Sequence, residues 1–264
     1  MGPEATNYFY GLLIKHTAAA SDQEHIRVLI WSNPEIPPRS DAILGHGTSP
    51  LPRLLEGVEK LERAGAELLV MPCISAHFWA ADIESRANVP FVNLLEESLA
   101  WIRKTLPGLK KAGVIATSGT VASGLWPKTF GKRGIEVIAP HPDEQSLVMD
   151  AILGEGGIKT GITSGRPRAT IVRMARRLVG RGAEAIIAGC TEVPLVLRDE
   201  DLAVPLVEPM KIGALACIKK AGYKVKYASL RALGAAISSA PQAKAYDSLK
   251  KRGLPRRKAP RKDR

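Results

Sequence analysis

Two stretches with the same layout decide the fold: residues 66–75 read AELLVMPCIS, and residues 183–192 read AEAIIAGCTE. In each, Gly-Ala-Glu leads into an apolar run that ends at a cysteine, eight residues after the glycine. A short apolar run bounded by turn residues is typical of a buried strand. The chain has only three cysteines, so the placing of two of them at the same point of a repeated unit needs an explanation.

Short apolar runs alternate with longer amphipathic segments along most of the chain. The strands expected from the apolar runs are 25–32, 67–72, 89–93, 112–120 (ending in a turn), 135–140, 184–189 and 204–209. The helices expected from apolar residues at helical spacing are 50–65, 75–88, 95–106, 121–134, 143–156, 167–182 and 210–222. Such regular alternation predicts an α/β fold with parallel sheets and helices on both faces.

The two halves of the chain repeat one order of elements: helix, Gly-Ala-Glu strand, cysteine and Val-Pro strand. We therefore expect two similar parallel-sheet α/β domains related by a pseudo-twofold axis. Residues 1–106 with 210–224 are expected to form the first domain, and residues 107–209 the second. Ligands bind at the carboxyl edge of parallel sheets, so Cys73 and Cys190 should face one interdomain cleft that forms the active site.

The halves differ at their beginnings. The second half opens with a strand, AGVIAT at 112–117, whereas the first opens directly on the loop MGPEAT at 1–6. We expect either that the natural N-terminus is longer by about one strand or that this chain is a truncated product. A lost strand would expose unpaired backbone groups and part of the core, so the chain as written is expected to fold less well.

Composition and charge limit the class of protein. A chain of 264 residues with 45% hydrophobic residues is globular, and 5% aromatics argues against a stacking surface for single-stranded nucleic acid. An odd number of cysteines forms no disulfide framework, which indicates a cytoplasmic protein. No apolar run reaches the roughly 18 residues of a membrane span, and the N-terminus has no signal-peptide pattern.

The net charge of +12 belongs mostly to one end, because residues 241–264 carry ten Lys or Arg against two Asp. Rich in charge and Pro, this segment has little to pack, and we expect residues 225–264 to form a basic, disordered tail. Such a tail can contact nucleic acid through phosphates. A solvated terminus without a partner is the interpretation that we favour.

Three chemical roles are open to Cys73 and Cys190. A disulfide is rare in a cytoplasmic enzyme, and a zinc site needs about four ligands, for which the sequence offers Cys73 and His77 but no second pair. We therefore expect no metal. Cys217, inside an apolar helix, is expected to be buried and inert.

Two thiols on opposite sides of one carbon suit stereoinversion, in which one thiolate removes a proton and the other thiol delivers one to the opposite face. Both cysteines fall where a strand ends and a helix is about to begin, and a helix N-terminus favours the thiolate. Thiols titrate at about pH 8.5, so a modest shift lets them act as acid or base near neutrality. Cationic side chains and backbone N–H groups can stabilise the developing charge without a cofactor.

Six motifs occur in the order typical of a known family: MGPEAT, DQEHI, SNPEIPPRSDAIL, MPCISAH, TSGT and AGCTEVPLVL. Over roughly residues 1–224 the chain resembles the aspartate/glutamate racemase superfamily, and most closely its aspartate racemase branch. The resemblance implies a two-domain, PLP-independent enzyme without cofactor, often a homodimer. It also implies that Cys73 and Cys190 are the two catalytic bases.

The resemblance implies further contacts to a small amino-acid substrate. Asn33 and Arg39 match substrate-binding positions, and Arg39 would bind a carboxylate in a bidentate manner. Lys159 matches a residue that approaches the other carboxylate, and Ser75 and Thr191 match residues that hydrogen-bond the substrate. From the residues alone, Arg39 and Lys159 would be ordinary solvated charges.

The chain departs from the family pattern at several points. Ile74 stands where the family usually has asparagine, and Glu208 stands where aspartate is more usual. The first strand is absent, and the tail has no counterpart. His77 is expected either to orient Cys73 or to cap a helix.

The sequence thus predicts a cofactor-independent racemase that interconverts L- and D-aspartate by two-base proton transfer. The alternatives are a related enzyme acting on another carboxylate (a glutamate or hydantoin racemase, or a maleate isomerase) and an inactive carboxylate-binding protein whose tail contacts nucleic acid. Both cysteines favour a two-base reaction, because a decarboxylase of this type needs only one.

Overall fold

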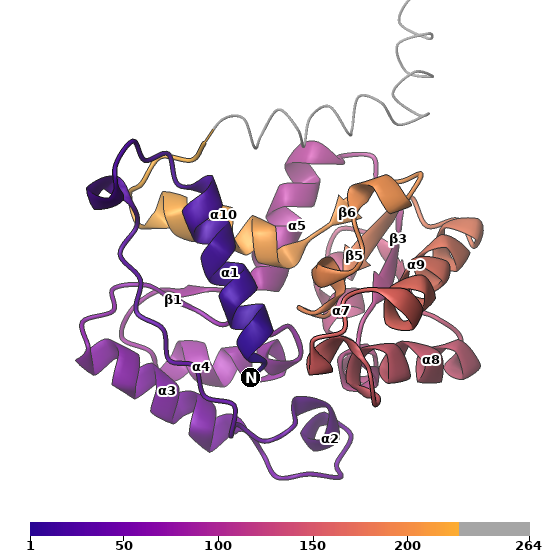
Figure 1. Cartoon of the computed structure of the whole chain (residues 1–264), viewed down its shortest axis with the longest axis horizontal. Helices are drawn as coiled ribbons and strands as arrows, with labels where there is room; N and C mark the ends of the chain where they lie inside the picture. Colours follow the sequence, from indigo (N-terminus) through magenta and orange to yellow (C-terminus); the bar gives the residue numbers. More distant parts are fainter. Residues whose placement is uncertain (227–264) are drawn as a thin grey trace, which may run out of the picture.

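The chain folds into two α/β units, each with its own parallel sheet (Figure 1). The computed structural model describes residues 1–226. Most of the segment expected to be a basic tail, residues 227–264, lies outside the described residues. The first two residues of that expected tail belong instead to the packed part: Val225 bridges Thr17, and the Lys226 N–H donates to the carbonyl of His16.

The second unit contains a four-stranded parallel sheet in the order β4-β3-β5-β6. Its strands are β3 (Lys111–Ile115), β4 (Glu136–Ile138), β5 (Ala185–Ala188) and β6 (Leu206–Val207). The apolar runs of β3 and β5 are buried on both faces. Alternate side chains therefore enter different cores: Ile186 packs in one cluster with α8 (Pro142–Leu153) and α9 (Gly165–Gly180), whereas Ile187 packs in the cluster on the opposite face.

The first unit contains a two-stranded parallel sheet, β1 (Leu69–Val70) paired with β2 (Phe91–Val92). One face packs against α3 (Leu51–Arg63) and α4 (Ala80–Arg86). The other face belongs to a large apolar cluster that includes α1 (Pro3–His16), α5 (Leu94–Thr105) and α10 (Pro209–Lys220). In this cluster α10 lies between α1 and α5, near the middle of the molecule (Figure 1).

Several short elements complete the described chain. They are α2 (Arg39–Ile43), α6 (Ser118–Ser123), α7 (Leu125–Gly131), and the 3₁₀ turns η1 (Asp22–Glu24), η2 (Ser75–Trp79), η3 (Ile158–Thr160), η4 (Val193–Leu195) and η5 (Asp199–Asp201). The single helix expected at 121–134 is divided at Gly124, whose φ of 66° lies in the left-handed region that glycine tolerates.

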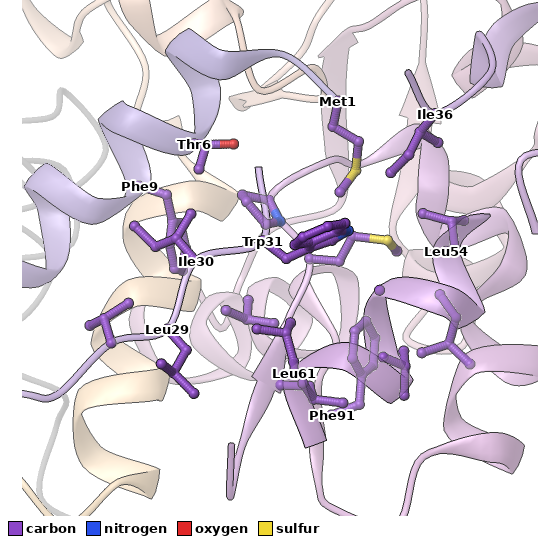
Figure 2. A pocket seen from close by; sticks show the side chains of 18 of the residues that line it. Met1, Thr6, Phe9, Leu29, Ile30, Trp31, Ile36, Leu54, Leu61 and Phe91 are labelled. Carbon is purple, nitrogen blue, oxygen red and sulfur yellow. The ribbon is translucent and has the colours of Figure 1, made fainter. Parts of the chain in front are cut away.

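Two expectations for the first unit were wrong. Residues 25–32, expected to be a strand, pair with no other strand in the described part of the chain, because the place beside them that a strand would occupy is a groove (Figure 2). Residues 1–6, expected to be a loop, already begin α1 at Pro3. Proline suits the first turn of a helix, and the apolar stripe of α1 faces the core from Ala5 onward.

The expected α/β class with two similar parallel-sheet units is confirmed. In each unit a strand leads to a cysteine (β1 and β5), and the neighbouring strand follows a Val-Pro dipeptide (β2 and β6). The boundaries expected at 106/107 and 209/210 stay a prediction. Among residues 1–226, none of the helices has the length and apolar character that a membrane span requires.

Candidate active site

A cavity of about 260 Å³ lies where the carboxyl ends of β1, β3 and β5 meet. Both units contribute to its wall, so it is an interdomain cleft. Six of the seven residues expected at the site line it: Arg39, Cys73, Ser75, Lys159, Cys190 and Thr191. They come together because equivalent strands of the two units end at this cleft.

Cys73 lies on the turn that follows β1, and its thiol contacts the hydroxyl of Ser75 (Sγ–Oγ 3.5 Å). The thiol side chain is buried in the first unit's core yet also lines the cleft. Ile74 is almost fully buried (1% exposed) in the large apolar cluster. Its side chain thus contributes packing where the family usually supplies an amide.

His77 joins the Cys73 turn to the start of α5. Its Nε2 accepts the Leu94 N–H (3.0 Å), so Nδ1 carries the proton and donates to the carbonyl of Cys73 (2.9 Å). Complete burial lowers the pKa of His77 to about 4, so the ring is neutral at physiological pH. His77 therefore holds the backbone of Cys73, without a hydrogen bond to the thiol, and satisfies a free N–H at the helix N-terminus.

Acid is expected to destabilise the protein through His77. Because its pKa falls from 6.5 to about 4 on folding, the unfolded chain takes up the proton first as the pH decreases. The contribution of neutral His77 to the free energy of unfolding is complete above pH 6.5. It is lost as the pH falls toward 4, by up to about 3 kcal/mol. Urea unfolding between pH 7.5 and 4.5 measures this loss.

His77→Gln should lower the free energy of unfolding at pH 7.5. It should also make the decrease of that free energy with falling pH less steep. His46→Gln, at an exposed histidine, provides the control and should leave the slope unchanged. If the slope of stability against pH is unchanged in His77→Gln, groups other than His77 cause the loss of stability in acid.

Cys190 is held in a buried hydrogen-bond network centred on Glu192. The carboxylate accepts hydrogen bonds from the thiol of Cys190 (2.9 Å) and the hydroxyl of Thr191 (3.1 Å), and it is ion-paired with Lys159. Burial raises the pKa of the Cys190 thiol well above its usual value, and the negative charge of Glu192 raises it further. The thiol of Cys190 is therefore protonated and donates its hydrogen bond to the carboxylate of Glu192.

Lys159 and Glu192 stabilise each other's charged forms. Burial favours the neutral form of both, but their mutual attraction is stronger: the pKa of Glu192 is lowered and that of Lys159 is raised. Side-chain exposure is 28% for Lys159 and 4% for Glu192, and both residues line the cleft. Gly2, directly before α1, packs against this pair, since a Cβ on Gly2 would lie 2.8 Å from Glu192 Oε1.

Arg39 lines the cleft, and its guanidinium is held on the loop before α2. Its Nη1 donates to the carbonyls of Ile36 (2.9 Å) and Pro37 (3.0 Å), which fixes the guanidinium on the loop before α2. Its Nε is buried without a hydrogen-bond partner within the described part of the chain. A buried, unpaired donor of a cationic group is costly to the folded state.

Asn33 is the one expected site residue that does not line the cleft. Its side-chain oxygen accepts the backbone N–H of Glu35 (2.9 Å), and its carbonyl accepts the N-terminal ammonium of Met1 (2.5 Å). Asn33 therefore belongs to the loop that leads to Arg39. Its side-chain oxygen is used within that turn, and the residue does not line the cleft.

Sequence reasoning missed five polar residues of the cleft. The hydroxyls of Ser40, Thr117 and Thr120 form a chain across the two units, with 3.1 Å between successive oxygens. Asp41 and Glu192 are the other two. The motifs TSGT and AGCTE contain three of these residues, so the signal was present, but the contact of Thr117 with Ser40 depends on how the units meet.

Within residues 1–226, no cluster of three or more His, Cys, Asp or Glu is arranged to hold a metal ion. All three cysteines are free thiols. Cys217 is buried in α10, and burial raises its pKa to about 12. It packs in the large apolar cluster, away from the cleft.

The family model that describes Asp/Glu/hydantoin racemases matches residues 1–217. The chain belongs to this family. The family relationship makes it an isomerase of the racemase class that acts on small amino-acid substrates, as the resemblance in its motifs implied.

Solved and curated relatives of this racemase differ in their substrates. Picrophilus torridus aspartate racemase is similar in structure, with a TM-score of 0.76 and 27% identity over 88% of this chain and 95% of that one. The broad specificity amino-acid racemase RacX of Bacillus subtilis (strain 168) is 26% identical over 83% of this chain and 92% of its own length. Glutamate racemase of Corynebacterium diphtheriae is 30% identical, over 55% of this chain and 52% of its own.

Proposed function

We propose that this racemase interconverts L- and D-aspartate by two-base proton transfer between Cys73 and Cys190. The observation that carries the proposal is the position of the two thiols, which line one cleft from equivalent strands of two related units. Groups delivered from two pseudo-symmetric units approach a bound carbon from two sides, as inversion requires.

In the proposed reaction, the thiolate of Cys73 removes the α-proton from one face of the substrate, and the electron pair stays on the α-carbon. The thiol of Cys190 gives its proton to the opposite face. The products are the other enantiomer, a Cys73 thiol and a Cys190 thiolate. The reverse reaction starts from that second state, and exchange with solvent restores the first.

Three groups bind and polarise the substrate in this proposal. The guanidinium of Arg39 binds one carboxylate, and the ammonium of Lys159 approaches the other, since both residues line the cleft. Both positive charges stabilise the negative charge that develops when the α-proton leaves. Ser75 and Thr191 donate or accept hydrogen bonds at the substrate's polar groups, and no cofactor is required.

Glu192 is the positioning residue for Cys190 in this mechanism. Its carboxylate orients the thiol through a hydrogen bond (2.9 Å) and keeps it protonated before the transfer. Lys159 balances the charge of Glu192, so the network stays ionised although it is buried.

A wider amino-acid specificity is the second candidate function. It is favoured by the similarity to a broad specificity amino-acid racemase and by Ile74, which supplies no polar group to the substrate. Glutamate, hydantoins and maleate remain alternative substrates. We also retain the homodimer and a cytoplasmic location as proposals. Nucleic-acid binding by the basic segment concerns residues outside the described range.

Incubation of the protein with L-aspartate in D₂O tests the proposal. We expect D-aspartate that carries deuterium at the α-carbon, because the delivered proton comes from a thiol in exchange with solvent. Parallel incubations with L-glutamate and other L-amino acids separate aspartate preference from wide specificity. A folded protein that gives neither inversion nor exchange with aspartate would exclude aspartate as the substrate.

A further inference from the structure

The two units meet beside the cleft through three short elements, η2, α2 and α6, which contact one another. Of these, α2 precedes the sheet of the first unit in the chain, and α6 follows β3 of the second. The first residue of η2 is Ser75 and that of α2 is Arg39, while Thr117 directly precedes α6. All three residues line the cleft. We call the contact between α2 and α6 the α2–α6 joint.

The α2–α6 joint is closed by a glycine. Gly119 is the second residue of α6, and its φ lies outside the left-handed region, so its backbone conformation alone would suit any residue. A Cβ on Gly119 would lie only 2.5 Å from the Cα of Ser40 and 2.9 Å from its Cβ, too close for carbon atoms. The close approach of α2, and not the path of the chain, therefore requires glycine at this position.

Hydrogen bonds hold the two helices at this distance. The hydroxyl of Ser40 donates to Oγ1 of Thr117 (3.1 Å), which lies 3.1 Å from Oγ1 of Thr120. Threonine before the first turn of a helix commonly caps that helix with its hydroxyl. The hydroxyl of Thr117 makes no such capping bond to α6. It is instead used in the contact between the two units.

Both sides of the joint are fixed to their own units. On the side of the second unit, Gln145 of α8 donates its Nε2 to the carbonyl of Ala116, just before the joint (2.9 Å). On the side of the first unit, Ser40 is the covalent neighbour of Arg39, whose Nη1 is held by two carbonyls of the preceding loop. A shift of Ser40 against α6 therefore displaces Arg39 as well.

We propose that the α2–α6 joint positions the guanidinium of Arg39 for a substrate carboxylate. Its positioning residues are Ser40, Thr117 and Gly119. The joint sets where Arg39, which comes from the first unit, lies in the cleft that it shares with Lys159 of the second. A misplacement of about 1 Å can cost about 10²-fold in rate, so the closeness of this contact matters for binding. The inference rests on the proposed function in one respect, the binding of a carboxylate by Arg39.

The dissociation constant of succinate measures this role without racemisation, because succinate is a dicarboxylate that has no amino group. NMR titration of the full chain covers weak as well as strong binding. Gly119→Ala is expected to weaken succinate binding about 10-fold, because the added methyl group must push α2 away. Gly131→Ala is the matched control: a Cβ at this residue of α7 would meet no atom within 4 Å, and binding should be unchanged.

A second pair of variants tests the hydrogen bond of the joint. Thr117→Val keeps the shape of the side chain and removes its hydroxyl, which should weaken succinate binding about 5-fold. Thr117→Ser retains the hydroxyl and should bind succinate nearly as well as the parent. Circular dichroism checks that each variant is folded. If Gly119→Ala does not fold, the comparison of the two Thr117 variants decides.

A double-mutant cycle shows whether the joint acts through Arg39. Arg39→Gln removes the guanidinium, and in that background Gly119→Ala and Thr117→Val should cause no further loss of affinity for succinate. Losses that add fully to that of Arg39→Gln would overturn the proposal. They would show that the joint, or a direct contact of Thr117 with the ligand, acts independently of Arg39.

Failure of this inference and failure of the proposed function give different results. A folded parent that does not bind succinate, or that binds it equally well after both Gly119→Ala and Thr117→Val, overturns the inference even if it racemises aspartate. Non-additive losses in the cycle, without inversion or exchange of aspartate, would support the role of the joint and exclude aspartate as the substrate.

Discussion

Cys190→Ala is expected to lower the rate of aspartate racemisation by about 10³-fold while leaving one-sided proton exchange in place. General acid–base catalysis by a positioned group contributes roughly 10²–10⁴-fold, and inversion in the proposed mechanism needs both thiols. With Cys190 removed, Cys73 can still take a proton from one enantiomer and return a deuteron from solvent to the same face. Deuterium should therefore enter one enantiomer of aspartate without inversion.

Cys73→Ala should show the mirror-image result, with exchange only in the other enantiomer. The two variants together assign each thiol to one face of the α-carbon, and proton NMR in D₂O with chiral chromatography measures both quantities. Loss of exchange from both enantiomers in both variants would contradict the proposal that each thiol acts as a base independently of the other.

Cys217→Ala is the matched control for these thiol variants. Cys217 is also buried, but it packs in α10 within the apolar cluster and does not line the cleft. Its replacement should leave racemisation within about twofold of the parent, because the group is remote from the reaction. A large loss in this variant would indicate that thiol replacement acts through the fold.

Glu192→Gln is expected to lower kcat by about 10²-fold, with a smaller effect on KM. The amide cannot carry the negative charge that keeps Cys190 protonated and balances Lys159. Because Glu192 raises the pKa of Cys190, its neutralisation should lower that pKa, so the thiol should ionise at a lower pH in the variant.

The shift in the titration of Cys190 separates this positioning role from a merely structural one. Thiolate absorbance followed against pH in a Cys73→Ala, Cys217→Ala background isolates Cys190, and the added Glu192→Gln change should move its midpoint downward. Glu192→Asp should recover part of the activity, since a carboxylate is restored.

Glu144→Gln is the matched control for Glu192→Gln. Glu144 is 8% exposed and pairs with Arg177 (2.5 Å), so it too is a buried, ion-paired carboxylate, but it lies at the start of α8 outside the cleft. The Glu144→Gln variant should have a lower free energy of unfolding and an unchanged kcat. Equal losses of kcat in both variants would show that Glu192 acts through stability.

Much of the fold follows from local patterns. The apolar runs at 112–115 and 185–188 predict buried strands because their side chains are apolar on both faces, and the structure has β3 and β5 there. The amphipathic segment 167–182 predicts α9 for a different reason, because its apolar residues recur at helical spacing along one face. Residues 25–32 have an equally strong strand pattern, yet they form no ladder, because strand formation needs a partner backbone that a local pattern does not supply.

The sequence by itself determined the class of the fold, the family, and six of the residues that line the cleft, the two cysteines among them. It could do so because motifs keep their linear order and carry their side-chain chemistry with them. Only the tertiary structure decided which groups meet. Asn33 uses its amide within its own turn, whereas Glu192, which belonged to no predicted set of site residues, binds Cys190 and Lys159 at once. Hydrogen bonds and pKa values depend on distance and burial, and Lys159 and Glu192, which are 33 positions apart along the chain, form their ion pair only when the second unit folds.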